Sequence, residues 1–118
     1  MSKRLINNIK HLKFKPFDNY GKVVNGMSWH RITYDKKNGG FGTYFLKMEP
    51  GAKSLFHKHK GFEEFLIIEG ELKDADGKIF KKGDFVTFFP GSTHNSFTKN
   101  GCLLLVFMRG INKQINKI

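Results

Sequence analysis

Short apolar runs, separated by glycine, asparagine and aspartate, follow one another along most of the chain. Nearly every gap carries a turn former, as at Pro50-Gly51 and Asp76-Gly77. Many short strands with regular turn signals are typical of a β-sandwich or β-barrel. We therefore predict an all-β fold with strands at residues 29–34, 43–48, 55–59, 63–68, 71–73, 79–80, 85–89, 94–97 and 103–108.

Residues 3–15 follow a different pattern from the rest of the chain. Their apolar positions, Leu5, Ile6, Ile9 and Leu12, recur close to the period of an amphipathic helix. A short helix and a swapped strand both fit this segment, and Pro16 is expected to end either one. We predict a single domain with three parts: an N-terminal extension at 1–28, a barrel at 29–110 and a C-terminal tail at 111–118.

The composition of the 118-residue chain agrees with one compact β-domain. Its 13 phenylalanines favour half-buried, pleated surfaces. No apolar run approaches the roughly 20 residues of a membrane helix, and the first residues lack the continuous apolar stretch of a secretory signal. Cys102 is the only cysteine, so it cannot form a disulfide within the chain, and we expect it to be buried. These features indicate a cytoplasmic protein.

The formal net charge of +11, from 21 Lys+Arg and 10 Asp+Glu, raises the possibility of a nucleic-acid partner. The basic residues are spread along the whole chain, however, and often occur in pairs such as Lys36-Lys37 and Lys81-Lys82. They form no dense patch and are not set among stacking aromatics. We interpret them as a solvated basic surface and expect neither a nucleic-acid nor a membrane partner.

The residues most suited to chemistry lie around two turns. On a strand, His57 and His59 share a face about 6.6 Å apart, a spacing that lets two imidazoles converge on one metal ion. A turn at residues 60–62 would return Glu63 beside them, and His94 would supply a further ligand after Pro90-Gly91. Glu64 is the other candidate carboxylate, but it faces the opposite side of the strand from Glu63.

The spacing of these residues resembles the cupin motifs. The first motif matches at every position, and the second is one residue shorter than usual and has Thr98 where an asparagine is typical. The doublet Glu63-Glu64, together with Glu69-Gly70, makes residues 29–109 similar to the ChrR-type cupin domain found at the C-terminus of anti-sigma factors. The matching positions are Gly51, His57, His59, Glu63 and Gly70 in the first motif, and Gly83, Pro90, Gly91 and His94 in the second.

This resemblance implies a double-stranded β-helix, the jelly-roll barrel of cupins, holding one divalent metal ion. By position, its ligands would be His57, His59, Glu63 and His94. The resemblance favours zinc, which would close the site with four ligands. Iron, nickel and manganese also suit these ligands and would leave positions open for water, oxygen or a substrate.

The resemblance leaves three hypotheses for the function. The first is a stand-alone metal-binding sensory or regulatory domain. The second is a non-haem metal dioxygenase, or a similar enzyme, acting on a small organic molecule such as a diketone. The third is a module that binds a small organic ligand in the barrel without turnover. No separate catalytic residue stands out. The segment before Trp29 lacks a Cys/His cluster, so we do not expect this chain to sequester a sigma factor by itself.

Strand alternation also predicts which apolar side chains line the interior. Phe65 and Ile67 should point inward with Glu63, whereas their neighbours should point outward. An outer face with several apolar residues needs a cover, which the N-terminal segment or a second copy would provide. We therefore predict a homodimer. The residues expected on this outer face are Leu66, Ile68, Leu104, Val106 and Met108.

Overall fold

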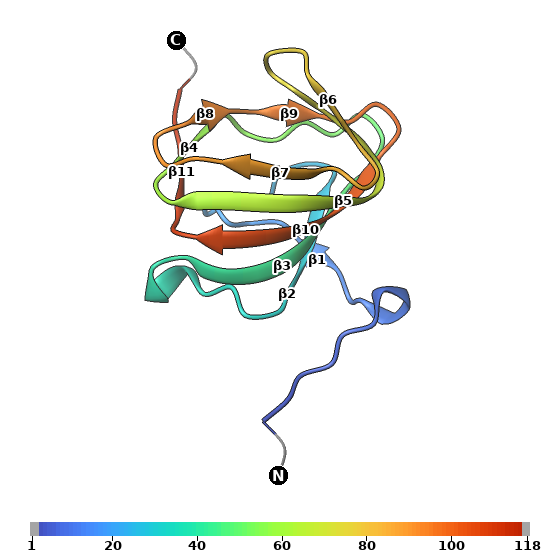
Figure 1. Ribbon diagram of the computed structural model, residues 1–118, viewed down its shortest axis with the longest axis vertical. Helices are drawn as coiled ribbons and strands as arrows, with labels where there is room; N and C mark the ends of the chain where they lie inside the picture. The colour runs from blue at the N-terminus through green and yellow to red at the C-terminus, as the bar shows by residue number, and fades with distance from the viewer. Residues whose placement is uncertain (1–2, 117–118) are drawn as a thin grey trace.

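The computed structural model describes residues 3–116, so the outermost residues of the predicted extension and tail lie outside the described part (Figure 1). Strands dominate, which confirms the predicted all-β fold. The helical structure in the described range consists of two 3-10 turns, at Ile9–His11 and Lys36–Asn38. The strands are β1 (Lys15–Pro16), β2 (Met27–Arg31), β3 (Phe41–Met48), β4 (His57–His59), β5 (Phe62–Asp74), β6 (Ile79–Lys81), β7 (Phe85–Phe88), β8 (Thr93–His94), β9 (Ser96–Phe97), β10 (Cys102–Arg109) and β11 (Asn112–Gln114).

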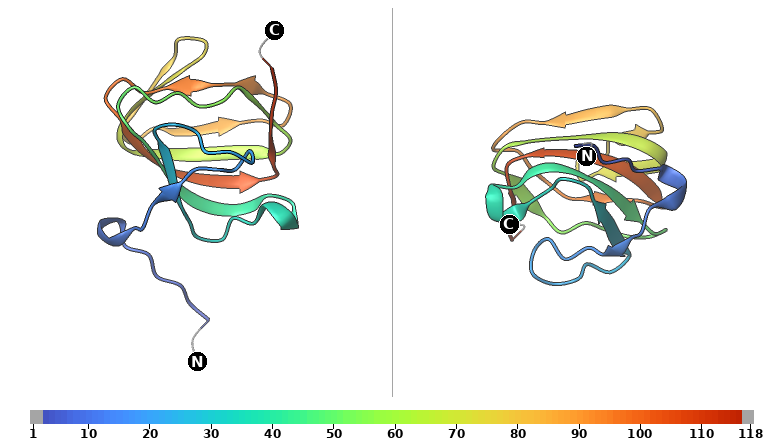
Figure 2. Two further views of the ribbon diagram at one scale, coloured as in Figure 1. Left: turned by 180° about the vertical axis from the view of Figure 1, so that it is seen from behind. Right: turned by 90° about the horizontal axis from the view of Figure 1, so that it is seen from below.

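Two antiparallel sheets build the body of the protein (Figure 1, Figure 2). The larger sheet has the order β1-β2-β3-β10-β5-β6, and β7 and β9 pair with further stretches of β5. The smaller sheet has the order β11-β4-β8. Side chains from both sheets line one shared interior cavity, so the two inner faces look toward each other. This arrangement agrees with the predicted jelly roll.

The long strand β5 changes its inward-facing positions part way along. Glu63 and Ile67 are buried before the change, and Asp74 is buried after it. Between them lies a β-bulge, where the pairing with β10 slips by one residue. Ile68 is the extra residue of the bulge. Two positions later, Gly70 has a φ of +78°, and a Cβ there would lie 2.1 Å from the carbonyl oxygen of Gly101. The bulge therefore turns Asp74 toward the interior, where regular alternation would turn it outward.

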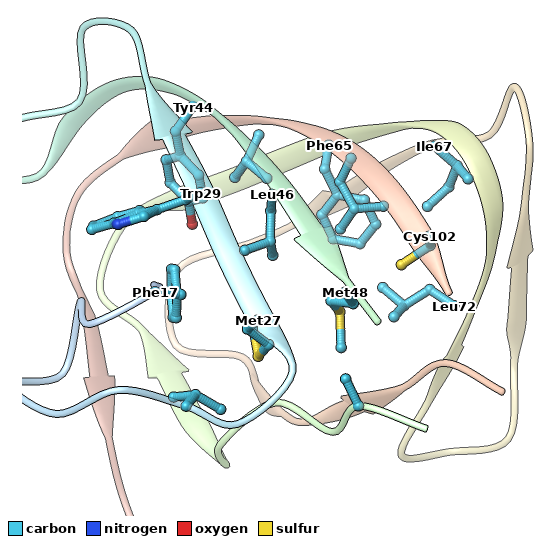
Figure 3. Close-up of a cluster of buried hydrophobic side chains, with 14 of the residues drawn as sticks. Phe17, Met27, Trp29, Tyr44, Leu46, Met48, Phe65, Ile67, Leu72 and Cys102 are labelled. Carbon is cyan, nitrogen blue, oxygen red and sulfur yellow. The ribbon is translucent and has the colours of Figure 1, made fainter. Parts of the chain in front are cut away.

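Apolar side chains, mostly from the larger sheet, fill much of the interior (Figure 3). Phe65 and Ile67 are only 2% and 1% exposed, which confirms the predicted inward face of β5. Val86 and Phe88 of β7 pack against this core, and the buried Cys102 lies within it, as expected. The other members include Phe17, Met27, Trp29, Tyr44, Leu46, Met48 and Leu72.

The prediction of which β10 side chains face outward is wrong. Leu104, Val106 and Met108 were expected on the outer face, but they are 2–3% exposed and belong to the core. Every position from 103 to 108 is apolar, so the pattern carries no information about which side faces inward. The outward positions belong instead to the partly exposed residues Leu103, Leu105 and Phe107.

The N-terminal segment does not form the amphipathic helix that its spacing suggested. Leu5 and Ile6 are 66% and 79% exposed, so no apolar face packs on the barrel. A short helix without such packing is marginal in water. Apart from the 3-10 turn at Ile9–His11, the chain reaches the larger sheet in extended form, and Lys15 then pairs with Trp29 (Figure 2). Among the described residues, no helix has the length and apolar character needed to cross a membrane.

Candidate metal centre

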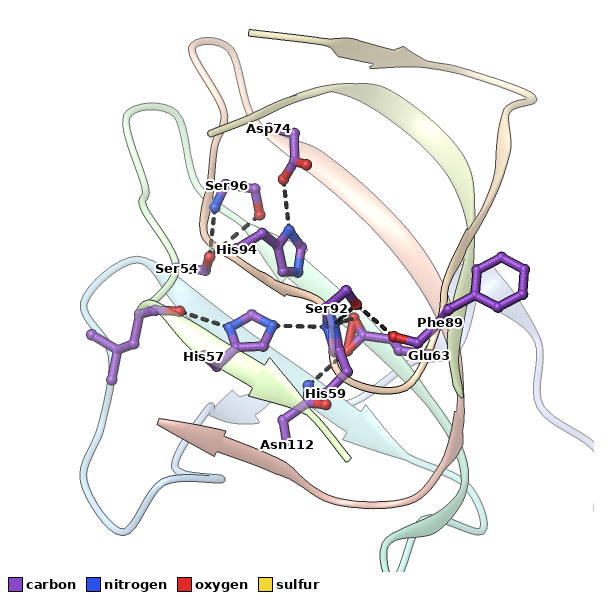
Figure 4. A network of polar contacts seen from close by, with 11 residues as sticks. Ser54, His57, His59, Glu63, Asp74, Phe89, Ser92, His94, Ser96 and Asn112 are labelled. Carbon is purple, nitrogen blue, oxygen red and sulfur yellow. Dashed lines mark hydrogen bonds and ion pairs between the residues drawn. The ribbon is translucent and has the colours of Figure 1, made fainter. Parts of the chain in front are cut away.

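The two sheets bring His57, His59, Glu63 and His94 into one buried cluster (Figure 4). The histidines come from β4 and β8 of the smaller sheet, and Glu63 comes from the start of β5 in the larger one. One ligand atom from each side chain lies within 4.8 Å of all the others. The structure therefore gathers the residues that the sequence singled out.

Local backbone structure accounts for this convergence. His57 and His59 alternate on β4 with the exposed Lys58, and His57 lies directly opposite His94 on β8. The turn that leads to Glu63 passes very close to the end of β10. A Cβ on Gly61 would lie 1.9 Å from the carbonyl oxygen at residue 109. Only glycine fits this approach, which returns Glu63 to the histidines.

The Nδ1 atom of each clustered histidine contacts an oxygen. His57 Nδ1 lies 2.7 Å from the carbonyl oxygen of Leu55. His94 Nδ1 lies 2.6 Å from Asp74 Oδ1. Both oxygens are acceptors, so both Nδ1 atoms carry the proton and donate it.

The third histidine, His59, is held by Ser92. Its Nδ1 lies 2.8 Å from Ser92 Oγ, and that hydroxyl donates its own proton to the carbonyl oxygen of Phe89 at 2.7 Å. Ser92 Oγ must therefore accept from His59 Nδ1–H. All three imidazoles are thus held with Nδ1 protonated, which leaves each Nε2 with a free lone pair in the neutral ring.

The inward Nε2 atoms form a place for a cation. Those of His57 and His59 lie 3.2 Å apart. Two lone pairs at this distance repel each other unless a proton or a metal ion lies between them. His94 Nε2 is buried and has no hydrogen-bond partner among the described residues. A metal ion would satisfy all three nitrogens, so these residues fit the implied metal.

Glu63 adds a negative charge to this cluster. Its Oε1 accepts a hydrogen bond from Asn112 Nδ2 at 2.7 Å, and its Oε2 lies 3.5 Å from His59 Nε2. Burial by itself raises the pKa of Glu63, but the contact with His59 and the neighbouring histidines outweigh it and lower the pKa to about 2. The carboxylate is therefore ionised at neutral pH.

Burial also sets the protonation state of His57. It lowers the pKa of that imidazole to about 4, although the charge of Glu63 partly opposes the shift. The ring is therefore neutral at pH 7, which is the form that binds a metal ion. Three neutral imidazoles and one carboxylate would give a net charge of +1 around a divalent ion.

Other titratable candidates lie outside the cluster. Glu64 is on the outer face, where it accepts from Thr87 Oγ1 at 2.8 Å and contacts Arg109. His30 is tied to the N-terminal segment, with its Nε2 2.9 Å from Asn7 Oδ1. His11 is exposed. The structure thus brings Glu63, rather than Glu64, to the histidines.

Sequence reasoning missed three residues that hold the cluster. Asp74 lies beyond the bulge, where alternation counted from Glu63 assigns the wrong face. Ser92 belongs to the second motif, but a single serine in a turn gave no signal of its own. Asn112 is in β11, a strand with polar residues that the pattern did not predict. It pairs with His59 across the smaller sheet.

An interior cavity of about 40 Å³ adjoins the cluster. His57, Glu63 and His94 line it, together with apolar side chains of the core. Tyr20 and Asn112 also line it, and these same two side chains border a surface pocket of about 250 Å³. The side chains of Tyr20 and Asn112 therefore lie between the cluster and this surface pocket.

Three solved structures are similar in fold. The polyketide cyclase RemF from Streptomyces resistomycificus has a TM-score of 0.76 at 18% identity, with 100% of this chain and 88% of that chain covered. An acetylacetone dioxygenase from Acinetobacter johnsonii has a TM-score of 0.72 at 15% identity, with 99% of this chain and 85% of that chain covered. The complex of Rhodobacter sphaeroides SigE with the anti-sigma factor ChrR has a TM-score of 0.65 at 17% identity, with 84% of this chain but 49% of that chain covered.

These likenesses establish the cupin fold but no activity, because every identity is low. No curated protein matches the chain by sequence. The family model of the ChrR cupin-like domain, by contrast, matches residues 2–112, which is more than the 29–109 expected from the motifs. The chain therefore belongs to the ChrR cupin-like domain family.

Proposed function

We propose that this protein binds one divalent metal ion through His57, His59, Glu63 and His94. The observation that carries the proposal is the convergence of three inward-facing Nε2 atoms whose rings are each fixed by a hydrogen bond at Nδ1. Such outer contacts orient histidine ligands and raise their basicity. Zinc is the preferred ion by family resemblance, and iron, nickel or manganese would suit the same ligands.

We further propose that the protein acts as a sensory or regulatory domain in the cytoplasm. Membership of the ChrR cupin-like family supports this role. The size of the interior cavity supports it too, since 40 Å³ suits a water-sized ligand rather than a large organic substrate. The single, buried cysteine is compatible with a reducing compartment.

A second candidate is a metal-dependent dioxygenase or related enzyme acting on a small organic molecule. The surface pocket beside Tyr20 and Asn112 favours it, because an outside molecule bound there would come close to the cluster. When bound, a redox-active ion such as iron would supply the site for oxygen chemistry. The iron-loaded protein should then consume oxygen with some member of a panel of diketones, thiols and phenolic ketones. No consumption with any of them would contradict this candidate.

We also propose a homodimer formed through the outer face of the larger sheet. This face carries the partly exposed residues Leu66, Ile68, Leu103, Leu105 and Phe107. Phe85, which is 55% exposed, packs beside Phe107 with a ring distance of 6.0 Å. Contiguous apolar surface of this kind usually needs a cover. Light scattering at micromolar concentration should give twice the monomer mass, and a monomer would contradict the proposal.

Metal analysis of protein purified without added metal tests the central proposal. Wild type should hold about one divalent ion per chain, and the same measurement identifies the element. His57→Ala should lose most of it, because one of the four ligands is gone. His30→Ala is the matched control, since it also removes an imidazole but lies outside the cluster. Equal metal content in wild type and His57→Ala would overturn the proposed site.

A further inference from the structure

The surface pocket beside the metal centre has a distinctive lining. It lies along β11, the outermost strand of the smaller sheet. Three lysines border it, Lys36, Lys60 and Lys113, and its lining contains no Asp or Glu from the described part of the chain. With a volume of about 250 Å³, it is large enough for a small organic molecule.

This pocket connects with the cluster through two side chains. The Tyr20 ring lies 6.0 Å from the His57 ring, and Tyr20 lines both the pocket and the interior cavity. Asn112 also lines both and donates to Glu63. Asn112 Oδ1 is buried without a hydrogen-bond partner among the described residues. A molecule in the pocket would therefore touch the residues that surround the proposed metal ligands.

Within residues 3–116, the lysines around this strand form no ion pair. Lys113 lies directly opposite Lys58 across the β11–β4 ladder. Like charges in such cross-strand pairs are destabilising. The side chain of Lys36 donates to the backbone carbonyl of Asn19, which holds its charge near the pocket. The arrangement concentrates positive potential at one entrance, where an anion would relieve the repulsion.

The backbone of β11 adds further donors. Lys60 N–H donates to the carbonyl oxygen of Ile111, and Ile115 N–H donates to that of Phe56. In an antiparallel ladder, bonded and non-bonded positions alternate. The N–H groups of Asn112 and Gln114 therefore point away from β4, toward the free edge that borders the pocket. Lysine ammonium groups and edge N–H groups together form a set of donors suited to carboxylate oxygens.

We propose that this pocket is the entrance site of a small organic carboxylate, which binds there beside the metal centre. The proposal deepens the proposed function by naming the ligand class, and it rests on that metal centre for its biological role. The carboxylate binds the lysines and the edge N–H groups, and the rest of the molecule lies against Tyr20 and Asn112. A neutral molecule of the same size gains none of the charge attraction.

Malonate and its uncharged analogue malonamide provide a matched pair of probes for calorimetric titration. Zinc-loaded wild type should bind malonate and should bind malonamide at least about tenfold more weakly. A tenfold change in affinity is about what three exposed ion pairs of ordinary strength contribute together. The combined change of Lys36, Lys60 and Lys113 to Gln should weaken malonate binding by a similar factor. Raising the salt concentration should also weaken binding, because exposed charges are screened.

The control variant changes Lys73, Lys81 and Lys99 to Gln. It removes the same net charge from exposed positions that do not line the pocket, so its malonate affinity should stay within about twofold of wild type. A second variant, Lys60→Gln with Lys113→Gln, keeps the contact of Lys36 with Asn19 and guards against a folding effect. Equal losses in the entrance and control variants would overturn the proposal, as would equal binding of malonate and malonamide.

The same titrations on metal-free protein separate this proposal from that of the metal centre. Malonate should bind the metal-free wild type more weakly, and its dependence on the three entrance lysines should remain. If the wild-type protein holds no metal but its malonate affinity depends on the three lysines, the proposed metal centre is wrong and the proposed entrance stands. If it holds metal but its malonate affinity does not depend on the lysines, the proposed entrance is wrong and the metal centre stands.

Discussion

Phe65 and Ile67 occupy their part of the interior through apolar contacts alone, whereas His57, His59 and His94 are each held by a hydrogen bond on the outer ring nitrogen. In the apolar part, stability depends on how completely side chains fill the volume, and each side chain contacts several neighbours. In the polar part, each imidazole depends on one oxygen atom. The same barrel therefore contains a region governed by packing and a region governed by individual hydrogen bonds.

The largest expected effect comes from opening a cavity in the apolar region. Phe65→Ala should lower the free energy of unfolding by about 3–5 kcal/mol, because the side chain is 2% exposed and its loss enlarges the cavity in the core. Urea denaturation of metal-free protein measures this loss. Ile67→Val, which removes one methyl group nearby, should cost only about 0.5–1.5 kcal/mol. Similar losses for the two variants would show that packing does not govern this region.

A smaller effect is expected where the backbone shapes the polar region. Gly61→Ala places a Cβ 1.9 Å from the carbonyl oxygen at residue 109, so the turn before Glu63 must shift. We expect an unfolding free energy lower by about 1–3 kcal/mol, as for other overpacked sites. Metal affinity should fall as well, because the shift displaces the carboxylate. Unchanged metal affinity in a titration would show that Glu63 is positioned by something other than this turn.

The next largest effect is expected from changing the carboxylate that accepts the hydrogen bond of His94 Nδ1. Asp74→Asn keeps the shape of the side chain but removes the charge that holds His94 Nδ1–H at 2.6 Å. Metal affinity should fall by about 10–100-fold, the usual cost of losing such an outer partner. Competition with a chelator measures it. Asp76→Asn, in the same turn but accepting only from the backbone of Lys78, should have almost no effect.

The smallest effect concerns the reactivity of Cys102 in the apolar region. Burial raises the pKa of its thiol to about 11, with a partial opposing influence of Thr98. At pH 8 the group is therefore almost entirely the unreactive thiol. Labelling with a disulfide reagent should be slow in native protein and fast in denaturant. Rapid labelling of the native protein would show that this region is open to solvent.

The sequence predicted His57, His59 and Glu63 from local spacing, and His94 from its place after Pro90-Gly91 in the second motif. The spacing of His57 and His59 requires only that they lie on a strand, and the short turn places Glu63 next to them. Asp74 could not be assigned in this way, because the bulge between Ile67 and Glu69 reverses the alternation between it and Glu63. Residue-by-residue periodicity cannot reveal such a reversal, since the bulge depends on the pairing with β10.

The same contrast applies to the fold. The alternation in β5 gave the correct inner face, since polar Glu63 marks the register for the apolar residues that follow. In β10 every position from 103 to 108 is apolar, and only the neighbouring strands decide that Leu104 points inward and Leu105 outward. Asn112 lies in a polar strand whose pairing with β4 is a long-range contact, so the sequence offered no pattern from which to predict it.

X-ray absorption spectroscopy of the zinc-loaded protein tests the proposed metal ligands, because it reports the atoms bound to the ion. We expect a first shell of nitrogen and oxygen at about 2.0–2.2 Å, with the outer-shell scattering of three imidazoles. His57→Ala should reduce this imidazole scattering by one ring. A shell containing sulfur at about 2.3 Å, or one without imidazole scattering, would contradict the proposed metal centre.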